Sequence, residues 1–499
     1  MIIESNYITV KNSGTSLSES SWDALPTEGL VNDTYAIINN IGGTSGYWLG
    51  RVTSGYWTVM SLTNEQILYL SANPRPPISG TIIETSAVFY NRVYSAFAEK
   101  PSNTSPVSRV AGQYTMVARN PLYRNTSATR CCIRLTNHTS ADIPIGRVWS
   151  STAGIWTVNL NTGSKKNIGS SSATNWVATT WSNSVIPSGT AQAPGIVSAW
   201  AEHPPGGTSA EGGVMFRFEV SAGPREERYR NPSSGFIQAN SLWTSSTADP
   251  TSTESLTWES FYGHPAMDVI FEVPQQVCTI GLFGDSTFQG YITGDECNSW
   301  SYLAQDRLSE LGYRINLANY AWTGEKTSAS YLRVQDSVNR RGDSWTGILV
   351  QPFSSNDLIG TSSTTSFSTL ARDTAISAIG PFVAYCSAVS AIPLFTEVLI
   401  EPGIFDTSAE SLRLREVWAA CNDKIYMDGL YAIVQSSATD PMVPISGTLR
   451  PDNVHLSAPT NTLTVCQTRP ATPTTGADLF AVAVAQTFPD FLRSQNINI

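Results

Sequence analysis

A single serine ends an apolar run in the stretch IGLFGDSTFQG, which covers residues 280–290. A serine in that position can be a plain turn former, or it can be a nucleophile presented to solvent. A serine hydroxyl is a weak nucleophile, so it needs a base in contact and a third group that orients the base. Of the four histidines, His455 alone lies in the C-terminal part of the chain, and Asp452 stands three residues before it. We therefore expect Ser286, His455 and Asp452 to be nucleophile, base and orienting carboxylate.

Acyl transfer through a serine also needs donors for the oxyanion, each worth about 10²–10³ in rate. Two candidates follow expected strand ends. Gly324, in ANYAWTGEKTS, has a backbone N–H that no side chain obstructs, and Asn356, in QPFSSNDLIG, has a side-chain amide. The backbone N–H of Ser286 is the third candidate. Asp285 is expected to be structural, as the cap of the turn that follows it, rather than catalytic.

The elements that must position these residues alternate between strand-like and helix-like runs after about residue 275. The strand-like runs are VCTIGLF, YRINLANYA, WTGILVQPF, IPLFTEVLIE and KIYMDGLYAIVQ. Helices are expected over SWSYLAQDRLSELG, which closes on Gly312, and over 371–391, 409–422 and 476–493. Such alternation predicts βαβ units and a mostly parallel sheet with helices on both faces. Reactive sites in these sheets lie at the carboxyl ends of the strands, which is where Ser286 is expected.

A chain of 499 residues is too long for one hydrophobic core. We predict a small module over 1–75, a β-rich domain over 76–274 and an α/β domain over 275–499. The stretch SANPRPPIS, at 72–80, is rich in proline and small polar residues and is predicted to be a linker.

Both N-terminal parts are predicted to be all-β. The first contains Thr-Ser-Gly-Tyr-Trp at 44–48 and again at 53–57, which predicts a hairpin. We favour a small core around Trp48 and Trp57 over a sugar-binding platform. In the second part, short strands broken by turns predict a β-sandwich or jelly roll. The expected strands are TRCCIRLTN, IPIGRVWS, IWTVNL, WVATTW, GIVSAWAE and GVMFRFEV.

Charge and cysteine usage exclude several classes of protein. Charged residues are sparse at 14% and the net charge is −10, which argues against a nucleic-acid backbone as partner. We expect no membrane span, because 18 consecutive apolar residues occur nowhere, and no secretory signal is visible. Seven cysteines without CxxC spacing favour neither a disulfide framework nor a zinc cluster. Cys131 and Cys132 are expected to bury one thiol on each face of a sheet. Arg341-Gly-Asp343, an adhesion tripeptide, is attributed to chance and surface solvation.

The candidate residues occur in a recognisable order. Gly284-Asp285-Ser286, Gly324, Asn356-Asp357 and Asp452-x-x-His455 resemble the four blocks of the SGNH/GDSL hydrolases, over about residues 276–499. The resemblance implies a flavodoxin-like α/β/α fold, with the nucleophile, base and orienting roles proposed above. It also implies that the glycine and the asparagine are oxyanion residues, and it implies no metal or organic cofactor.

The chain departs from the family pattern in three places. Ser354 occupies the third-block position where glycine is usual, and a Cβ there can tilt the loop that carries Asn356. Asn453 stands where glycine is common. A Thr- and Pro-rich insertion at about 459–474 follows the histidine, and it is a candidate lid or oligomer contact.

The resemblance leads us to expect a serine esterase that removes acyl groups, by preference O-acetyl, from a carbohydrate. The segment WDALPTEGLVNDTYAIINNIGGTSGYW loosely resembles short modules of phage tail and fibre proteins. This favours a virion-associated or extracellular deacetylase of host surface polysaccharide, attached to other virion proteins by its N-terminal module. Proteins of that kind are often trimers, so a homotrimer is among the expectations. The alternatives are a non-catalytic glycan-binding or structural virion protein with a degenerate fold, and an SGNH lipase or thioesterase.

Overall fold

The computed structural model divides the chain into two compact units, residues 1–90 and 91–499. The structure describes residues 2–4, 7–9, 19–21, 35–41, 44–53, 56–61, 82–83, 91–96, 107–118, 120–122, 126, 128–137, 139–151, 176–188, 196–202, 214–225, 241–244, 266–290, 299–357, 368–398, 408–434, 444–449, 455–457 and 472–499. The two predicted domain boundaries, after residues 75 and 274, stay predictions, and the expected linker at 72–80 lies outside the described residues.

The first unit contains short strands. They are β1 (Ile2–Glu4), β2 (Tyr7–Thr9), β3 (Glu19–Ser21), β4 (Tyr35–Ile41), β5 (Thr44–Thr53), β6 (Tyr56–Ser61) and β7 (Ile82–Ile83). Strands β3 to β7 form one sheet in sequence order, and β1 pairs with β2. The described residues of the repeated pentapeptide lie in an antiparallel strand pair, because β5 pairs with β6 and Thr53 lies opposite Tyr56.

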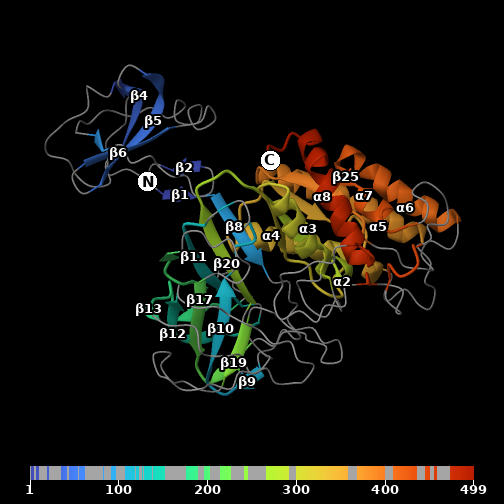
Figure 1. Cartoon of the computed structure of the whole chain (residues 1–499), viewed down its shortest axis with the longest axis horizontal. Coiled ribbons are helices and arrows are strands. Elements are labelled where there is room, and N and C mark those ends of the chain that lie inside the picture. The colour runs from blue at the N-terminus through green and yellow to red at the C-terminus, as the bar shows by residue number, and fades with distance from the viewer. Residues whose placement is uncertain are drawn as a thin grey trace. The chain divides into compact units, whose positions relative to one another are not determined.

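The N-terminal half of the second unit is built of antiparallel strands (Figure 1). They are β8 (Asn91–Ala96), β9 (Val107–Arg109), β10 (Gly112–Ala118), β11 (Arg130–Thr136), β12 (Ile143–Ser151), β13 (Val177–Thr179), β14 (Val185–Ile186), β15 (Ile196–Val197), β16 (Ala201–Glu202), β17 (Val214–Val220), β18 (Gly223–Arg225), β19 (Ser241–Thr244) and β20 (Ala266–Val273). One sheet runs β13-β12-β17-β10-β19, with β14 on β12, and another runs β15-β11-β20-β8, with β16 on β11.

These two sheets share a hydrophobic core. Tyr114, Phe216 and Phe218 of the first sheet and Ile133 and Phe271 of the second are all buried in it. The expected strand IWTVNL and much of the span 76–274 lie outside the described residues, so the β-sandwich as a whole stays a prediction.

The central strands β11 and β20 of the sheet β15-β11-β20-β8 are buried on both faces. Cys131 and Val269 lie in the core shared by the two antiparallel sheets. Their chain neighbours Cys132 and Ile270, with Tyr94 of β8, lie in the core of the C-terminal part. The predicted burial of one thiol on each face is therefore confirmed, and both thiols are unbridged. We call the sheet β15-β11-β20-β8 the wall sheet, because each of its faces belongs to a different hydrophobic core. The sharing of this sheet explains why residues 91–499 form one unit.

The C-terminal half of the second unit is an α/β sheet flanked by helices. Its elements are β21 (Cys278–Phe283), α2 (Ser286–Gln289), α3 (Trp300–Glu310), β22 (Ile315–Asn319), α4 (Thr327–Asn339), β23 (Gly347–Val350), η5 (Ser355–Asp357), α5 (Thr369–Ala388), β24 (Ile392–Thr396), α6 (Ser408–Ala420), η6 (Asn422–Lys424), β25 (Ile425–Tyr426), α7 (Asp428–Tyr431) and α8 (Gly476–Ser494). The strands run in the order β22-β21-β23-β24-β25, and every pair is parallel. Numbered within the sheet this is the order 2-1-3-4-5 of flavodoxin-like folds. The flavodoxin-like α/β prediction is thus confirmed for the described residues.

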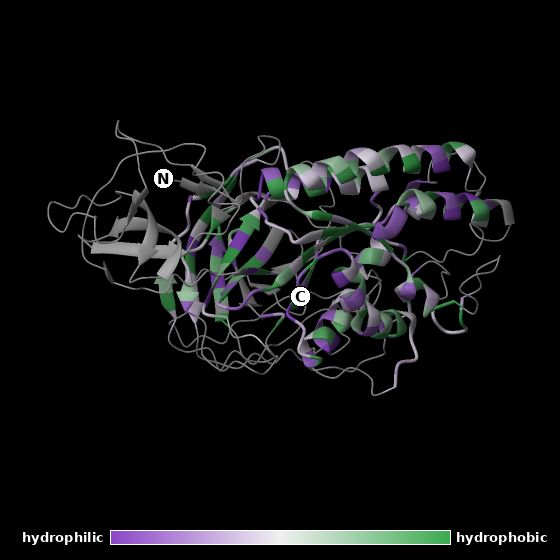
Figure 2. Ribbon diagram, turned by 90° about the horizontal axis from the view of Figure 1, so that it is seen from above, coloured by the Kyte–Doolittle hydropathy of each residue, from purple (hydrophilic) through white to green (hydrophobic). Residues whose placement is uncertain are grey.

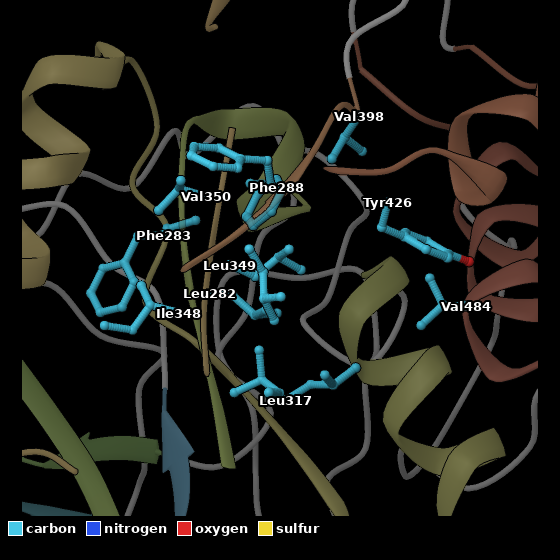
Figure 3. Close-up of a cluster of buried hydrophobic side chains, with 14 of the residues drawn as sticks. Leu282, Phe283, Phe288, Leu317, Ile348, Leu349, Val350, Val398, Tyr426 and Val484 are labelled. Atoms are coloured by element: carbon cyan, nitrogen blue, oxygen red, sulfur yellow. The ribbon is translucent and has the colours of Figure 1, made fainter. Parts of the chain in front are cut away.

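The helices form two groups, as the strand order requires. From β21 to β22 the chain moves toward one edge of the sheet, and from β22 to β23 it moves toward the other edge. Right-handed crossovers therefore place α3 and α4 on opposite faces of the sheet. In agreement, α8 packs against α3 and α7, whereas α5 packs against α4 and α6. The strands between them are apolar, and Figure 2 shows hydrophobic green along the sheet and mixed colours on the helices. Leu282, Leu317 and Leu349 of three adjacent strands meet in this core (Figure 3).

Most of the expected elements of this half are present, with one correction and one omission. The run KIYMDGLYAIVQ was expected to be a strand, but only β25 is extended and α7 follows it. Its neighbour β24 ends at Thr396, so a longer strand would have no partner for its backbone. Helix α4 was not predicted, because its sequence TSASYLRVQDSVN is polar and lacks a clear apolar period. No helix among the described residues is long and apolar enough to span a membrane.

The expected surface solvation of Arg341-Gly-Asp343 is wrong. The Asp343 side chain has 0% exposure and pairs with Arg134 Nη1 of β11 at 2.7 Å and with Arg341 Nη2 at 2.9 Å. Gly342, with a φ of +67°, turns the chain back toward the sheet directly after α4. This turn brings the carboxylate to the boundary with the β-sheets, where it meets buried guanidinium groups.

The wall sheet gives the first prediction. Ile270→Ala, at the face toward the α/β core, should lower the free energy of unfolding by about 2–5 kcal/mol because it opens a cavity there. Val269→Ala, at the opposite face of the same strand, is the matched variant. Calorimetry should show that both changes lower the melting temperature of one common transition of residues 91–499. Two transitions, each sensitive to only one variant, would contradict a shared wall.

Candidate active site

Ser286 is the first residue of α2, directly beyond the carboxyl end of β21. Asp285 caps this short helix, and its Oδ1 accepts from Thr287 N at 2.9 Å and from Thr287 Oγ1 at 2.7 Å. The prediction that Asp285 is a structural cap is confirmed. The cap fixes the turn that lifts Ser286 from the strand end.

Gly284 allows this turn to lie close to the next strand. A Cβ at Gly284 would come within 2.6 Å of Gln351 Oε1 and 2.7 Å of Phe288 Cγ. Gln351, just after β23, uses that oxygen to accept from Asp285 N at 2.9 Å. The glycine is therefore required by packing, and Gln351 ties the serine turn to the neighbouring strand end.

The structure brings Ser286 and His455 together although 169 positions separate them. His455 Nε2 lies 2.9 Å from Ser286 Oγ, which is hydrogen-bond distance. Ser286 is 8% exposed and His455 is half-buried. A hydroxyl that donates to a neutral imidazole is the arrangement by which a serine is activated.

The short segment around His455 is anchored by its next two residues. Leu456 is buried and forms an isolated β-bridge with Leu449. Ser457 N donates to Thr448 O at 2.8 Å, and Ser457 Oγ accepts from Gly476 N at the start of α8 at 2.9 Å. The histidine is thus held at the sheet edge by a packed core residue and by α8. Asp452 and residues 459–471 of the insertion at about 459–474 lie outside the described residues, so their roles stay predictions.

Gly324 lies in the loop between β22 and α4, beside the serine turn. Its φ is +71°, a left-handed conformation that favours glycine. Two residues earlier Trp322 N donates to Gly284 O at 2.8 Å, and Thr323 N donates to Gln289 Oε1 of α2 at 2.8 Å. These bonds place the exposed Gly324 next to the segment that carries Ser286.

Asn356 lies in η5, after β23, where its amide is engaged within the protein. Its Nδ2 donates to Glu325 O at 3.2 Å and to Ser354 Oγ at 3.1 Å. An amide nitrogen has two protons, so both are accounted for. Asn356 therefore links its loop to the residue that follows Gly324, and its service as an oxyanion donor stays a prediction that requires one of these bonds to be exchanged.

Ser354, the departure from the family's glycine, joins the site's loops. Its Oγ lies 2.7 Å from Asp285 Oδ2 and 3.1 Å from Glu325 O. A hydroxyl has one proton, so Ser354 Oγ donates to one of these two acceptors. The shorter distance indicates that it donates to the Asp285 carboxylate. Its lone pairs then accept from Asn356 N at 3.2 Å and from the Asn356 amide. The hydroxyl thus connects the serine turn to the loop after β23.

The next residue of the third block, Asp357, holds the start of α4. Its Oδ2 accepts from Thr327 Oγ1 at 2.8 Å and from Ser354 N at 3.0 Å. Burial raises the pKa of Asp357 above its ordinary value, and these hydrogen bonds oppose that shift. Sequence patterns did not single out the supporting groups Gln351 and Gln289, and they noted Ser354 only as a departure from glycine, not as a hydrogen-bonding group. Their one signal is that they follow or flank the expected ends of β21 and β23.

Metal ligation has no candidate in the part of the chain that the structure describes. There, no group of three or more His, Cys, Asp or Glu side chains could hold an ion. The chemistry that the described residues can perform is nucleophilic attack by Ser286 with proton transfer to His455.

Ser354 gives the second prediction. Ser354→Ala should lower the free energy of unfolding by about 1–3 kcal/mol, because the buried Asp285 carboxylate and the Asn356 amide lose a partner. Ser355→Ala, at the half-buried neighbouring position, is the control. Urea titration measures both. Equal small losses in the two variants would show that the Ser354 hydroxyl does not hold the loops together.

Comparisons with known proteins give likenesses of low similarity. No protein-family model matches the chain, and no curated protein matches it. Among solved structures, the psychrotrophic esterase EstA from Pseudoalteromonas sp. is 16% identical with a TM-score of 0.31, covering 43% of this chain and 99% of its own. A carbohydrate esterase family 2 enzyme with its carbohydrate-binding domain, from Corynascus thermopiles, is 10% identical with a TM-score of 0.31, covering 80% of this chain and 99% of its own. The acetyl xylan esterase AlAXEase is 16% identical with a TM-score of 0.29, covering 41% of this chain and 97% of its own. Scores of this size carry no argument about what the chain does, so its function must follow from the geometry of its own residues.

Proposed function

We propose that the chain is a serine esterase of the SGNH type, with Ser286 as nucleophile and His455 as general base. The observation that carries the proposal is the 2.9 Å contact between His455 Nε2 and Ser286 Oγ at the carboxyl edge of a parallel sheet. A plain turn serine needs no imidazole partner from a segment 169 positions away. The order of the strands supports the same conclusion, because ligands of such sheets bind where the order reverses, between β21 and β23.

The reaction proceeds in two halves. Ser286 Oγ attacks the ester carbonyl while its proton passes to His455 Nε2, and a tetrahedral oxyanion forms. His455 then gives the proton to the leaving alcohol as the C–O bond breaks, which leaves an acyl group on the serine. Water, deprotonated by the same imidazole, attacks this acyl-enzyme and releases the carboxylic acid and the free serine.

The backbone N–H groups of Ser286 and Gly324 are the donors proposed for the oxyanion. Each donor of this kind is worth about 10²–10³ in rate. The left-handed conformation of Gly324 and the bonds of Trp322 and Thr323 to the serine segment support its assignment. Asn356 is the third proposed donor, and Asp452 is the proposed partner of the His455 ring.

We propose a carbohydrate O-acetyl ester as substrate. Support comes from the β-rich part, which packs on the α/β core through the wall sheet, because a β-rich part beside a catalytic domain suits a polymeric glycan. The resemblance to SGNH/GDSL hydrolases, which include many carbohydrate acetyl esterases, points the same way. A phage tail spike or fibre that deacetylates host polysaccharide, as a virion-associated trimer, is the proposed setting, and its support is the N-terminal sequence alone.

A non-catalytic glycan-binding or structural protein is the alternative from another class. Its hint in the sequence is Ser354 in place of glycine. The hydrogen bonds of Ser354 to Asp285 and Asn356 favour a site that is held together rather than degenerate.

The serine and histidine give the third prediction. Ser286→Ala should lower the rate of p-nitrophenyl acetate hydrolysis by at least about 10³-fold, because the nucleophile is lost. His455→Ala should have a similar effect, and the double variant should be little worse than either, since the two residues act as a unit. Ser309→Ala, which changes a buried serine of α3, is the control and should keep the wild-type rate. A Ser286→Ala rate equal to that of the wild type would end the esterase hypothesis.

Substrate choice gives the fourth prediction. Across p-nitrophenyl esters, kcat/KM should be highest for acetyl or propionyl and fall as the acyl chain lengthens. A steady rise with chain length would favour the lipase or thioesterase alternative. Acetate release should also be measured on a panel of O-acetylated bacterial polysaccharides. Failure on all of them, with the small ester still cleaved, would remove the glycan assignment and leave the esterase intact.

A further inference from the structure

A cluster of buried charges lies where the wall sheet meets the α/β core. Arg134 of β11 and Asp268 of β20 are 3% and 4% exposed. Arg134 Nε donates to Asp268 Oδ1 at 2.9 Å, and its Nη2 donates to the other carboxylate oxygen. Burial raises the pKa of Asp268, but the guanidinium of Arg134 outweighs burial and keeps it below its usual value. The pair is therefore charged and held in one geometry.

This carboxylate reaches across to the α/β core through Tyr320. The hydroxyl of Tyr320, the residue after β22, donates to Asp268 Oδ2 at 2.5 Å. Its ring stacks on Phe283 at 5.8 Å between centroids, and Arg341 lies over it at 4.1 Å. Burial raises the pKa of Tyr320 well above its usual value, so the phenol keeps the proton that it donates.

The backbone of Tyr320 in turn begins the loop that carries Gly324. Its N–H donates to Leu282 O at 2.8 Å, and its carbonyl accepts from Arg333 Nη2 of α4. Arg333 lies 3.6 Å from the Trp322 ring centroid and pairs with Glu325 at 2.9 Å. Burial lowers the pKa of Arg333 to about 10, so it remains a cation at neutral pH. The residues on both sides of Gly324 are thus fixed by Tyr320 and Arg333.

We propose that Asp268, a residue of the β-sheets, is a positioning residue for the reaction at Ser286: through the Tyr320 hydroxyl it sets the 320–325 loop and the direction of the Gly324 N–H. This rests on the proposed esterase function. It gives the β-rich part a role in the rate of reaction, beyond any role in holding a polymer. Neither Asp268 nor Tyr320 touches the substrate in this proposal.

The physical reason is the narrow tolerance of oxyanion stabilisation. A donor must lie within hydrogen-bond distance of the place where charge develops. A displacement of about 1 Å can cost about 10²-fold in rate. A loop with an exposed glycine has little intrinsic rigidity, so bonds to its buried flanking residues are what define it.

Tyr320→Phe tests the proposal, because it removes the link and keeps the Arg134–Asp268 pair. We expect kcat for p-nitrophenyl acetate to fall between about 10-fold and 100-fold, with KM changed less than about twofold. The pH dependence of kcat/KM should keep its wild-type shape, because the Ser286–His455 pair is intact. Asp268→Asn keeps an acceptor for the phenol, so folded Asp268→Asn protein should lose less of its kcat than Tyr320→Phe does.

Tyr426→Phe is the matched control. It removes another buried tyrosine hydroxyl, which bonds to Thr487 Oγ1 of α8 at 2.9 Å and has no link to the 320–325 loop. It should lower the melting temperature comparably but keep kcat within about twofold. An unchanged kcat in Tyr320→Phe, or an equal loss in Tyr426→Phe, would overturn the positioning role. A wild-type rate in Ser286→Ala would instead overturn the esterase function, so the two failures are distinguishable.

Discussion

The carboxylate of Asp285 is fully buried. Much of the geometry of the site depends on the hydrogen-bond donors that this carboxylate requires. A buried carboxylate is costly unless hydrogen bonds replace its hydration. Thr287 supplies two of them within the serine turn, and Ser354 supplies one from the loop after β23. The first set shapes the helix that begins at Ser286. The second ties this helix to the segment with Asn356, so one desolvated group specifies the spacing of two loops.

A second constraint acts from outside the α/β sheet. Strand β11 has buried residues at six successive positions. In a strand with one solvent-exposed face, buried and exposed residues would alternate. Each face of this strand fits a different core, and the ion pair of Arg134 with Asp268 lies on the face toward Tyr320. Packing in the β-rich part and the geometry at the sheet edge are therefore coupled through contiguous contacts.

The sequence predicted well what is encoded by order and by local pattern. Ser286 and His455 were paired because His455 is the one histidine of the C-terminal part, and the order of the candidate blocks agreed. Helix α3 ends just before Gly312, as expected. For Ser354 the sequence indicated only a Cβ that can tilt its loop, and it did not indicate that the hydroxyl joins two loops. Its value depends on a carboxylate 69 positions away, and no local pattern records such a partner.

Burial of one thiol on each face of β11 was expected, but what covers each face was harder to predict, for the same reason. The run TRCCIRLTN indicates a strand, and its lack of alternation is a signal that both faces are covered. It does not say by what. Arg134 within that run would suggest a solvent-exposed face. Its burial is explained by ion pairs with the distant residues Asp268 and Asp343. Likewise, α4 is polar enough to be missed, although the steps of a parallel sheet require a connection there.

The wall sheet also constrains how genes for such proteins can recombine. A junction near residue 90 would separate the two compact units and leave each core whole. A junction between β20 and β21, which looks like a natural seam in the sequence, would pair a sheet with a foreign α/β core. Tyr94, Cys132 and Ile270 would then meet side chains with which they had not evolved. Shuffling should therefore exchange the N-terminal module freely, while the β-sheets and the α/β sheet are inherited as one piece.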